Sequence, residues 1–214
     1  MVKREVFFDG ACLPVNPGGI ACWGAVAVED GDVIKEKAGI VSRKGTNNIA
    51  EWTGLIEAMR LAKELGWKRV TILGDSQLVV NQFRGSWRIN KQRLKNLYVM
   101  AAKEAVDLTV NVIWIRREKN LADPVCHRAF IEDVEKASRK RAETQLKDYT
   151  IRKNGAGYLV GKDGQRAYRV LLDPPYCTCG FFQRYRGYPL LKRSDILIRC
   201  KHLFMVELCQ KSAP

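Results

Sequence analysis

Residues 46–75 read TNNIAEWTGLIEAMRLAKELGWKRVTILGD, and the spacing of their apolar residues changes at Gly66. Up to Leu65 the apolar residues recur every three to four positions, which is typical of a helix with one buried face. After Gly66, residues 70–73 form a short apolar run that indicates a strand. Because a helix between two strands can act as a crossover connection, this segment permits parallel strand pairing.

The segments on either side of this helix and strand complete one domain. Three strands are expected before it, because turn sequences separate three strand-like stretches at residues 3–9, 22–28 and 32–41. Beyond it we expect helices at 77–83, 91–106 and 122–142 and a strand at 109–115. The predicted order is βββαβααβα, an α/β fold with a five-stranded mixed sheet.

The C-terminal part of the chain differs in character and is expected to form a second domain. Short strand-like stretches at residues 149–151, 158–160 and 168–172 are separated by turn sequences, and closely spaced cysteines follow them. We therefore predict a boundary near residue 147, with domains at 1–147 and 148–214.

The overall composition favours a globular protein with an anionic partner. Hydrophobic residues make up 46% and charged residues 28% of the chain, which indicates neither disorder nor a membrane protein. The formal net charge of +14 favours nucleic-acid binding over a merely basic surface. No secretory signal is expected at the N-terminus, and the seven cysteines suggest metal ligation over disulfides, so we expect a reducing cytoplasmic location.

Glu51 lies on the face of the predicted helix that is otherwise apolar. The other residues of that face are Gly54, Leu55, Ala58, Leu61, Ala62 and Leu65. A buried carboxylate without a partner is costly, so Glu51 requires a hydrogen-bond donor, a cation or a metal ion. A buried ion pair with a core arginine would also satisfy it.

Three further acids occur where strands or helices are expected to begin or end. Asp9 and Asp75 each follow an apolar run, and side chains at the ends of parallel strands often form sites, although either could instead bond to the backbone of its own turn. Asp123 precedes Pro124, which also fits a helix N-cap. Taken together with Glu51, four gathered acids would repel one another without cations, so the set indicates a metal site.

Five short motifs, in this order, closely resemble those of ribonuclease HI. They are FDGAC at residues 8–12, NPGG at 16–19, TNNIAE at 46–51, GDSQ at 74–77 and NLAD at 120–123. The resemblance covers roughly residues 3–133 and is strongest to the compact archaeal-type branch. Several linked motifs in sequence are a specific signal.

This resemblance implies the ribonuclease H-like fold and a two-metal-ion mechanism. Asp9, Glu51, Asp75 and Asp123 would hold two Mg²⁺ or Mn²⁺ ions, one activating a water and the other stabilising the leaving 3′ oxygen. The implied enzyme cuts the RNA strand of an RNA/DNA hybrid and leaves 5′-phosphate and 3′-hydroxyl ends. We expect the enzyme to be a monomer and not to bind a membrane.

The resemblance also implies contacts with the minor groove of the hybrid. They are made by Gly10, Cys12, Asn16, Asn47, Asn48 and Gln77. Short polar groups can read the 2′-hydroxyl of RNA, but Asn16 and Asn47 are equally suited to turn and cap hydrogen bonds. Because the acids alone do not select the substrate, a nuclease acting on DNA or double-stranded RNA is an alternative. A non-catalytic nucleic-acid-binding module is another, although the intact set of four acids argues against it.

Two features depart from many ribonuclease HI proteins. Residues 84–93 combine cationic side chains with Trp87, as expected of a surface that contacts phosphates and stacks on bases. This segment is shorter than the basic protrusion that the familiar bacterial enzymes carry at the same place. The short segment 116–120 lacks the histidine that many relatives carry before the last acid. His127 follows Asp123 by one helical turn and could approach the site, but we interpret it as a helix-surface histidine.

The C-terminal domain carries the donor set of one structural Zn²⁺ ion. Cys177, Cys179, Cys200 and His202 supply three thiols and an imidazole, and their spacing, CxCx₂₀CxH, resembles the SWIM zinc finger, a small ββα-type module. Unrelated free thiols are the alternative. Between the ligand pairs lie basic and aromatic residues: Phe181, Phe182, Arg184, Tyr185, Arg186, Tyr188, Lys192, Arg193 and Arg199. This mixture suits stacking on bases and contacting phosphates, so we expect the module to assist nucleic-acid binding.

Overall fold

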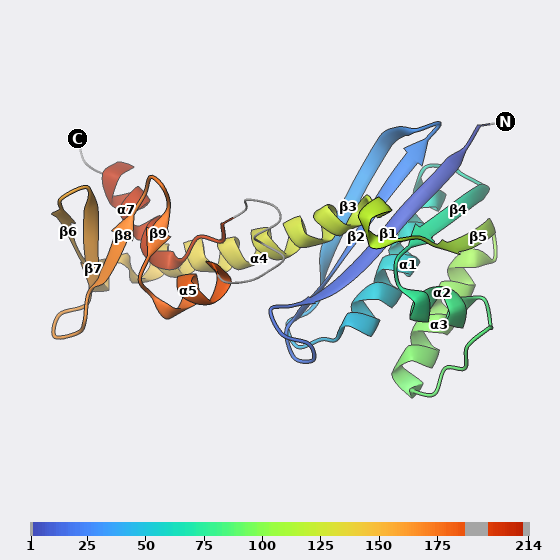
Figure 1. Cartoon of the computed structure of the whole chain (residues 1–214), viewed down its shortest axis with the longest axis horizontal. Helices are drawn as coiled ribbons and strands as arrows, with labels where there is room; N and C mark the ends of the chain where they lie inside the picture. The colour runs from blue at the N-terminus through green and yellow to red at the C-terminus, as the bar shows by residue number, and fades with distance from the viewer. Residues whose placement is uncertain (1, 187–196, 212–214) are drawn as a thin grey trace. The chain divides into compact units, whose positions relative to one another are not determined.

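The computed structural model describes residues 2–186 and 197–211 and consists of two compact units, Met1–Phe130 and Ile131–Pro214 (Figure 1). The division falls within a long helix, α4 (Ala122–Gln145), whose second half belongs to the second unit. We predicted from the sequence a domain boundary near residue 147, and α4 ends close to it, at Gln145. That the chain consists of two domains at 1–147 and 148–214 stays a prediction. None of the described helices is long and apolar enough to cross a membrane.

The first unit contains all nine predicted elements in the predicted order. Its strands are β1 (Arg4–Leu13), β2 (Ile20–Glu29), β3 (Asp32–Ser42), β4 (Arg69–Gly74) and β5 (Thr109–Trp114). Its helices are α1 (Asn47–Glu64), α2 (Gln77–Phe83), α3 (Gln92–Ala105), the short η1 (Arg117–Lys119) and the start of α4. The sheet order is β3-β2-β1-β4-β5, with β1 to β3 antiparallel and β1, β4 and β5 parallel, so the predicted mixed sheet is confirmed.

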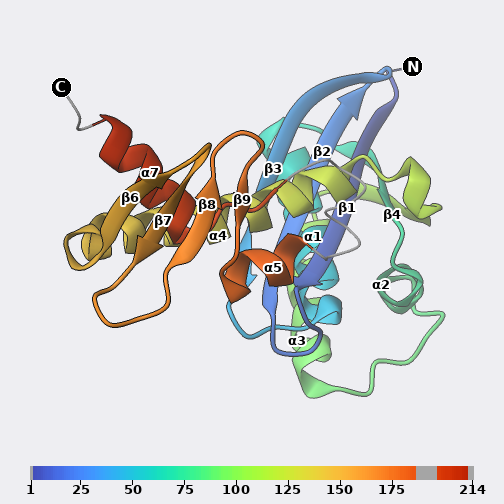
Figure 2. The ribbon, with the colours of Figure 1, turned by 60° about the vertical axis from the view of Figure 1, so that its left-hand side comes forward.

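Helices cover both faces of this sheet because the side chains of its strands alternate between the faces. On one face, Val6, Phe8 and Ala25 pack in the main core with α1. On the other face, Phe7, Val26 and Val28 pack against Ala122 and Val125 at the start of α4. Both ribbon views accordingly show α1 and α4 on opposite sides of β1 and β2 (Figures 1 and 2).

The second unit is built around a small antiparallel sheet of order β6-β7-β8-β9. Its elements after α4 are η2 (Leu146–Asp148), β6 (Thr150–Asn154), β7 (Gly157–Gly161), β8 (Tyr168–Leu171), β9 (Tyr176–Cys177), α5 (Gly180–Arg186) and α7 (Lys201–Lys211). The buried residues of its core include Val160, Val170, Phe182, Leu203 and Phe204. The three predicted strands and the helix of the expected ββα-type module are confirmed, whereas β9 and α5 were not predicted.

Candidate active site and metal centre

Asp9 and Asp75 lie at the point where the parallel pairing of β1 with β4 ends. The last registered pair is Phe8 with Gly74, and each aspartate is the next residue of its chain segment. The prediction that Asp9 ends its strand is wrong, because antiparallel pairing with β2 carries β1 on to Leu13 and places Asp9 opposite Gly24. The sheet therefore brings the two acids to the same edge while keeping Asp9 on regular strand backbone.

Glycines let two helices approach the backbone of the sheet beside Asp9. A Cβ atom on Gly10 would lie 2.1 Å from the backbone carbon of Ala50 in α1, and one on Gly54 would lie 2.5 Å from the carbonyl oxygen of Asp9. A Cβ on Gly24 would lie 2.7 Å from the amide nitrogen of Cys126 in α4. Any larger residue at one of these glycines would force the backbones apart. The glycines therefore set how close α1, with Glu51, and α4, with Asp123, lie to the sheet.

Glu51 extends from α1 to the start of α2. Its Oε2 atom accepts a hydrogen bond of 2.7 Å from the hydroxyl of Ser76, and the same hydroxyl caps α2 by accepting from the amide of Val79. Burial raises the pKa of Glu51, the Ser76 hydrogen bond lowers it, and the negative charge of Asp75 raises it further, so the net shift is upward. The predicted partner for the acid is therefore a hydroxyl group, and sequence reasoning had not identified Ser76.

Asn120 connects Asp75 to the rest of the site. Its side-chain nitrogen donates to Asp75 Oδ1 at 2.8 Å and to the carbonyl oxygen of Phe8 at 2.9 Å. Its side-chain oxygen accepts from the amide of Ala122, so Asn120 also caps the start of α4. Sequence reasoning quoted Asn120 within the NLAD motif but assigned it no role, although a buried asparagine must satisfy its hydrogen bonds in this way.

Asp123 lies in the first turn of α4 and is not its N-cap, because the helix begins at Ala122 and the capping oxygen belongs to Asn120. Its Oδ1 atom accepts hydrogen bonds from the guanidinium group of Arg117, at 2.9 Å from Nε and 2.5 Å from Nη2. Burial raises the pKa of Asp123, but hydrogen bonds and charge from His127 and Arg117 outweigh burial and hold this pKa below its ordinary value. Asp123 is thus the acid of the set that the chain itself stabilises in the ionised form.

His127 is not the helix-surface residue that we predicted. Its side chain is 13% exposed, and its Nδ1 atom lies 3.3 Å from Asp123 Oδ2. The imidazole therefore packs beside the last acid of the set. The i, i+4 spacing was visible in the sequence, but the packing around this helical face was not.

Asp9 has one side-chain oxygen that the described residues leave without a hydrogen bond. It is 6% exposed, and among the described residues its Oδ2 atom is buried without a hydrogen-bond partner. Burial, and then the negative charges of Asp75 and Asp123, raise the pKa of Asp9 to about 7. An orphaned carboxylate oxygen close to the charges of Asp75 and Asp123 fits the oxygen-rich environment that binds Mg²⁺ or Mn²⁺, so the residues present suit a divalent cation.

The predicted substrate contacts are partly used within the protein. Asn47 Oδ1 accepts from the amide of Cys12 at 2.7 Å, and the amide of Asn47 donates to Asn16 Oδ1 at 3.0 Å. The structural alternative that we weighed for Asn16 and Asn47 is thus realised. Gln77, in contrast, is exposed at the first position of α2.

A groove of about 330 Å³ lies beside these asparagines. It is lined by Asn16, Pro17, Thr46, Asn48, Ile49, Lys91, Arg93 and Leu94. Two cations of the basic stretch 84–93 are therefore brought next to two of the predicted contact residues, while Trp87 of the same stretch is 47% exposed. Cations beside short polar groups suit a phosphodiester backbone.

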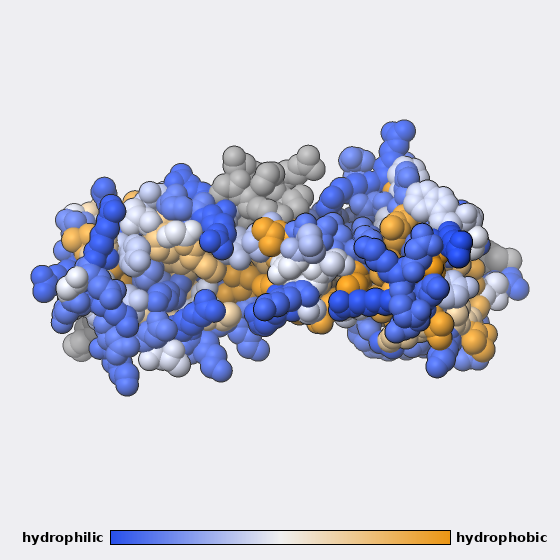
Figure 3. All heavy atoms as spheres, turned by 90° about the horizontal axis from the view of Figure 1, so that it is seen from below, coloured by the Kyte–Doolittle hydropathy of each residue, from blue (hydrophilic) through white to orange (hydrophobic). Residues whose placement is uncertain are grey.

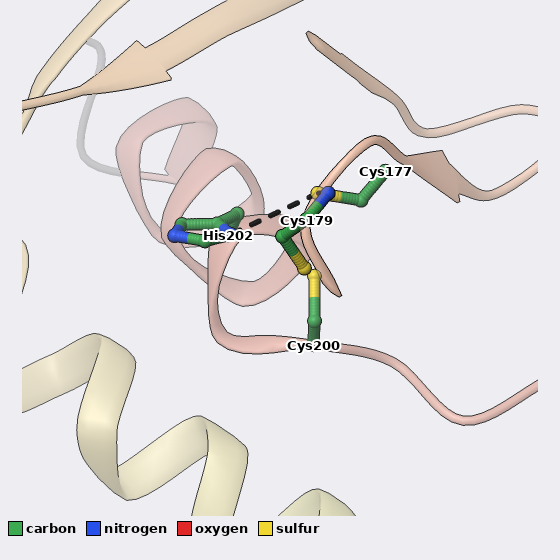
Figure 4. Close-up of side chains that lie close together, drawn as sticks. All are labelled: Cys177, Cys179, Cys200 and His202. Atoms are coloured by element: carbon green, nitrogen blue, oxygen red, sulfur yellow. Dashed lines mark hydrogen bonds between the residues drawn. The ribbon is translucent and has the colours of Figure 1, made fainter. Parts of the chain in front are cut away.

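The second unit brings Cys177, Cys179, Cys200 and His202 together (Figure 4). All four residues are buried, and one donor atom of each lies within 4.8 Å of the others. His202 turns Nδ1 toward the cysteines, 3.7 Å from Cys177 Sγ, and its ring stacks on Tyr168 at a centroid distance of 4.4 Å. Three thiols and an imidazole converging in this way form the donor set of a tetrahedral metal site.

The basic and aromatic residues between the ligand pairs divide into three groups. Phe182 and Tyr185 are buried, the partly buried Phe181 packs against Tyr185, and Arg199 joins α4 to α7 through ion pairs with Glu135 and Glu207, so these four stabilise the unit itself. The exposed cations of α5 are Arg184 and Arg186. Three further members of the predicted set lie outside the described residues: Tyr188, Lys192 and Arg193. Hydrophilic residues cover most of the visible face of this unit (Figure 3).

Comparison with known proteins places the first unit in a family. The model of the reverse transcriptase-like family matches residues 7–129, more than half of the chain. Ribonuclease H from Chlorobium luteolum is 40% identical over 107 residues, which are 50% of this chain and 68% of that protein. Ribonuclease HI from Halobacterium salinarum is 37% identical over 99 residues, 46% of this chain and 49% of that protein.

A solved structure extends the similarity to three dimensions. The crystal structure of LC11-RNase H1 in complex with an RNA/DNA hybrid matches with a TM-score of 0.57 and 26% identity, covering 62% of this chain and 99% of that one. The chain therefore belongs to the reverse transcriptase-like family, and its first unit is a type 1 ribonuclease H domain with the ribonuclease H-like fold. The matched region is only about half the length of the Halobacterium protein.

Proposed function

We propose that the chain hydrolyses the RNA strand of RNA/DNA hybrids, leaving 5′-phosphate and 3′-hydroxyl ends. The observation that carries this proposal is a chain of neighbouring carboxylates from β1, α1, the end of β4 and the start of α4, one of them with a buried oxygen that has no hydrogen-bond partner among the described residues. In this proposal Asp9, Glu51, Asp75 and Asp123 hold two Mg²⁺ or Mn²⁺ ions. When bound, such ions activate a water for in-line attack on the phosphodiester and stabilise the leaving oxygen.

Neighbouring side chains orient the carboxylates and offset part of their charge. Ser76 donates a hydrogen bond to one oxygen of Glu51, and Asn120 donates one to an oxygen of Asp75. These hydrogen bonds limit the rotation of the two carboxylates before the substrate binds. Arg117 offsets part of the negative charge through its contact with Asp123. Carboxylates held in this way need little reorganisation during the reaction, which is how an active site lowers a barrier electrostatically.

The hybrid is the substrate that the surroundings favour. Asn16 and Asn48 line the groove that also carries Lys91 and Arg93, so polar groups that can read a 2′-hydroxyl lie next to cations that can bind phosphates. A structure similar to the first unit was solved in complex with an RNA/DNA hybrid. We infer that the exposed Gln77 extends this contact surface, whereas Gly10 and Cys12, which the resemblance also implied, are buried, and the amide of Cys12 already donates to Asn47.

The test compares three end-labelled substrates: an RNA/DNA hybrid, duplex RNA and duplex DNA. Each is incubated with the full chain in Mg²⁺, Mn²⁺ or EDTA, and with an Asp75→Asn variant as the inactive reference. We expect metal-dependent cutting of the RNA strand of the hybrid alone, with 5′-phosphate products. Cutting of duplex DNA or duplex RNA would instead identify a different nuclease of this fold, and hybrid binding without cutting would identify a binding module.

For the second unit, we propose a SWIM-type zinc module that strengthens hybrid binding. One Zn²⁺ held by Cys177, Cys179, Cys200 and His202 would be structural, because four protein ligands leave no open position for chemistry. The exposed Arg184 and Arg186 on α5 are then candidates for phosphate contacts. Seven cysteines, three of them assigned to Zn²⁺, are consistent with the reducing, cytoplasmic location that we also propose.

A double substitution, Arg184→Ala with Arg186→Ala, should weaken hybrid binding and raise KM while leaving kcat nearly unchanged. Each lost phosphate contact lowers the slope of log K against log salt by about 0.9, so the pair should lower it by about 1 to 2. Arg152→Ala with Lys153→Ala removes the same charge from the exposed part of β6 and serves as the control. Equal losses in both variants would contradict a specific role for α5.

A further inference from the structure

His127 lies one helical turn after Asp123 on α4. Its side chain is largely buried at 13% exposure, and Nδ1 is 3.3 Å from Asp123 Oδ2. Its Nε2 atom is buried and has no hydrogen-bond partner among the described residues. The contact with Asp123 is thus the only polar contact that we find for this imidazole within that part of the chain. The side chain of His127 therefore faces the acid site and not the solvent.

The two oxygens of Asp123 have different partners. Oδ1 contacts Arg117, which comes from η1 and whose side chain is 46% exposed. Oδ2 contacts His127, which belongs to the same helix as Asp123 itself. Residues four apart on one helix are neighbours whatever the rest of the site does, so the contact with His127 does not depend on η1. Arg117, in contrast, is a partly exposed cation that a divalent ion could replace.

We propose that His127 is a positioning residue that holds Oδ2 of Asp123, so that Oδ1 is the oxygen that binds the divalent ions when they replace Arg117. This inference rests on the proposed function, because it assumes that Asp123 is a metal ligand. A carboxylate fixed by one oxygen cannot rotate freely, and less ordering is required when a cation binds to the other. Partners that orient metal-binding carboxylates in this way typically contribute 10- to 100-fold to metal affinity.

Two substitutions separate positioning from packing. His127→Leu keeps a side chain of substantial size but removes the donor, whereas His127→Gln keeps a donor that can reach an aspartate four residues earlier on a helix. Should the leucine variant not fold, His127→Ala supplies the same test without added bulk. Asp123→Asn serves as the reference for loss of the acid itself.

The measurement is Mn²⁺ binding to the zinc-loaded full chain by titration calorimetry, without nucleic acid. We expect binding to be about 10- to 100-fold weaker in His127→Leu and close to wild type in His127→Gln. The increase in melting temperature that Mn²⁺ produces should shrink in the leucine variant and recover in the glutamine variant. A purely structural role would lower the melting temperature equally with and without Mn²⁺ and leave the affinity unchanged, which would overturn the proposal.

This design also separates the inference from the proposed function. If the wild type binds Mn²⁺ through Asp123 but does not cut the hybrid, the proposed activity fails while the binding data still decide the role of His127. If Asp123→Asn binds Mn²⁺ as well as the wild type, or the wild type does not bind it, then Asp123 is not a ligand and the positioning role is wrong.

Discussion

Replacing Asp9 by asparagine should abolish cleavage of the hybrid and at the same time stabilise the metal-free protein. The loss of activity follows from removing a carboxylate that we assign to the divalent ions, and a drop of about 10³-fold or more is expected, equivalent to ~4 kcal/mol. The gain in stability follows because Asp9 is 6% exposed and lies near the negative charges of Asp75 and Asp123. Asparagine removes that repulsion.

The stability gain should depend on pH. The pKa of Asp9 is raised from 3.8 to about 7 in the folded protein, so the folded state binds a proton more tightly than the unfolded state does. Below about pH 4 both states are protonated at Asp9, and the two proteins should be similarly stable. As pH rises through 7 the wild type loses up to about 4 kcal/mol of stability that the variant keeps.

All five tryptophans lie in the first unit, so tryptophan fluorescence reports its unfolding separately from the second unit. Urea unfolding of the zinc-loaded chain without Mg²⁺ or Mn²⁺ at pH 5 and pH 8 would measure the effect. Asp107→Asn is the matched control, because the Asp107 side chain is 71% exposed and its removal should change stability by less than about 0.5 kcal/mol. An Asp9→Asn variant that cuts the hybrid, or that is less stable than wild type at pH 8, would contradict the assignment.

Replacing Cys200 by serine should unfold the second unit. Cys177, Cys179 and Cys200 are buried with Phe182, Leu203 and Phe204 in one small core, so the proposed zinc ligands are also core residues. Structural Zn²⁺ contributes about 10–16 kcal/mol of apparent binding free energy in small zinc domains, more than a core of this size supplies by itself. Loss of one thiolate ligand therefore removes most of the free energy that holds the unit together.

Zinc content by mass spectrometry and limited proteolysis would measure this effect. We expect one Zn²⁺ per wild-type chain, less in Cys200→Ser, and rapid cleavage of the variant within residues 148–214. Cys209→Ser is the matched control, because Cys209 is exposed on α7 and lies outside the cluster. Full zinc content and unchanged protease resistance in Cys200→Ser would show that the four residues are not a structural metal site.

The sequence was most informative where the signal is local. Alternating and helical apolar patterns predicted the nine elements of the first unit, and Glu51 was identified because an acid on an apolar face demands an explanation. The Cys/His cluster that we assign to zinc was identified from the pairwise spacing of its members. Helix α5 was missed because its seven residues are too few to show a helical period among so many aromatic and basic side chains.

Partners that are distant in the chain could not be predicted in the same way. The extension of β1 beyond Asp9 depends on pairing with β2, and no apolar run marks it. Asn120 contacts Phe8 and Asp75, which precede it by 112 and 45 residues. The burial of His127 depends on how α4 packs against β2, where Gly24 permits a close approach.

The sequence by itself determined the nine elements of the first unit, which four acids are anomalous and which four residues can hold zinc. These properties follow from the spacing of residue types, which acts over a few positions of the chain. Only the tertiary structure decided which carboxylate oxygens are held and which are left free: Ser76 holds Glu51, Asn120 holds Asp75, and Asp9 keeps one oxygen unsatisfied. The physical reason is that hydrogen bonds require atoms within about 3 Å of one another, and those positions are set by the pairing of β1 with β4 and the packing of α1 on β1.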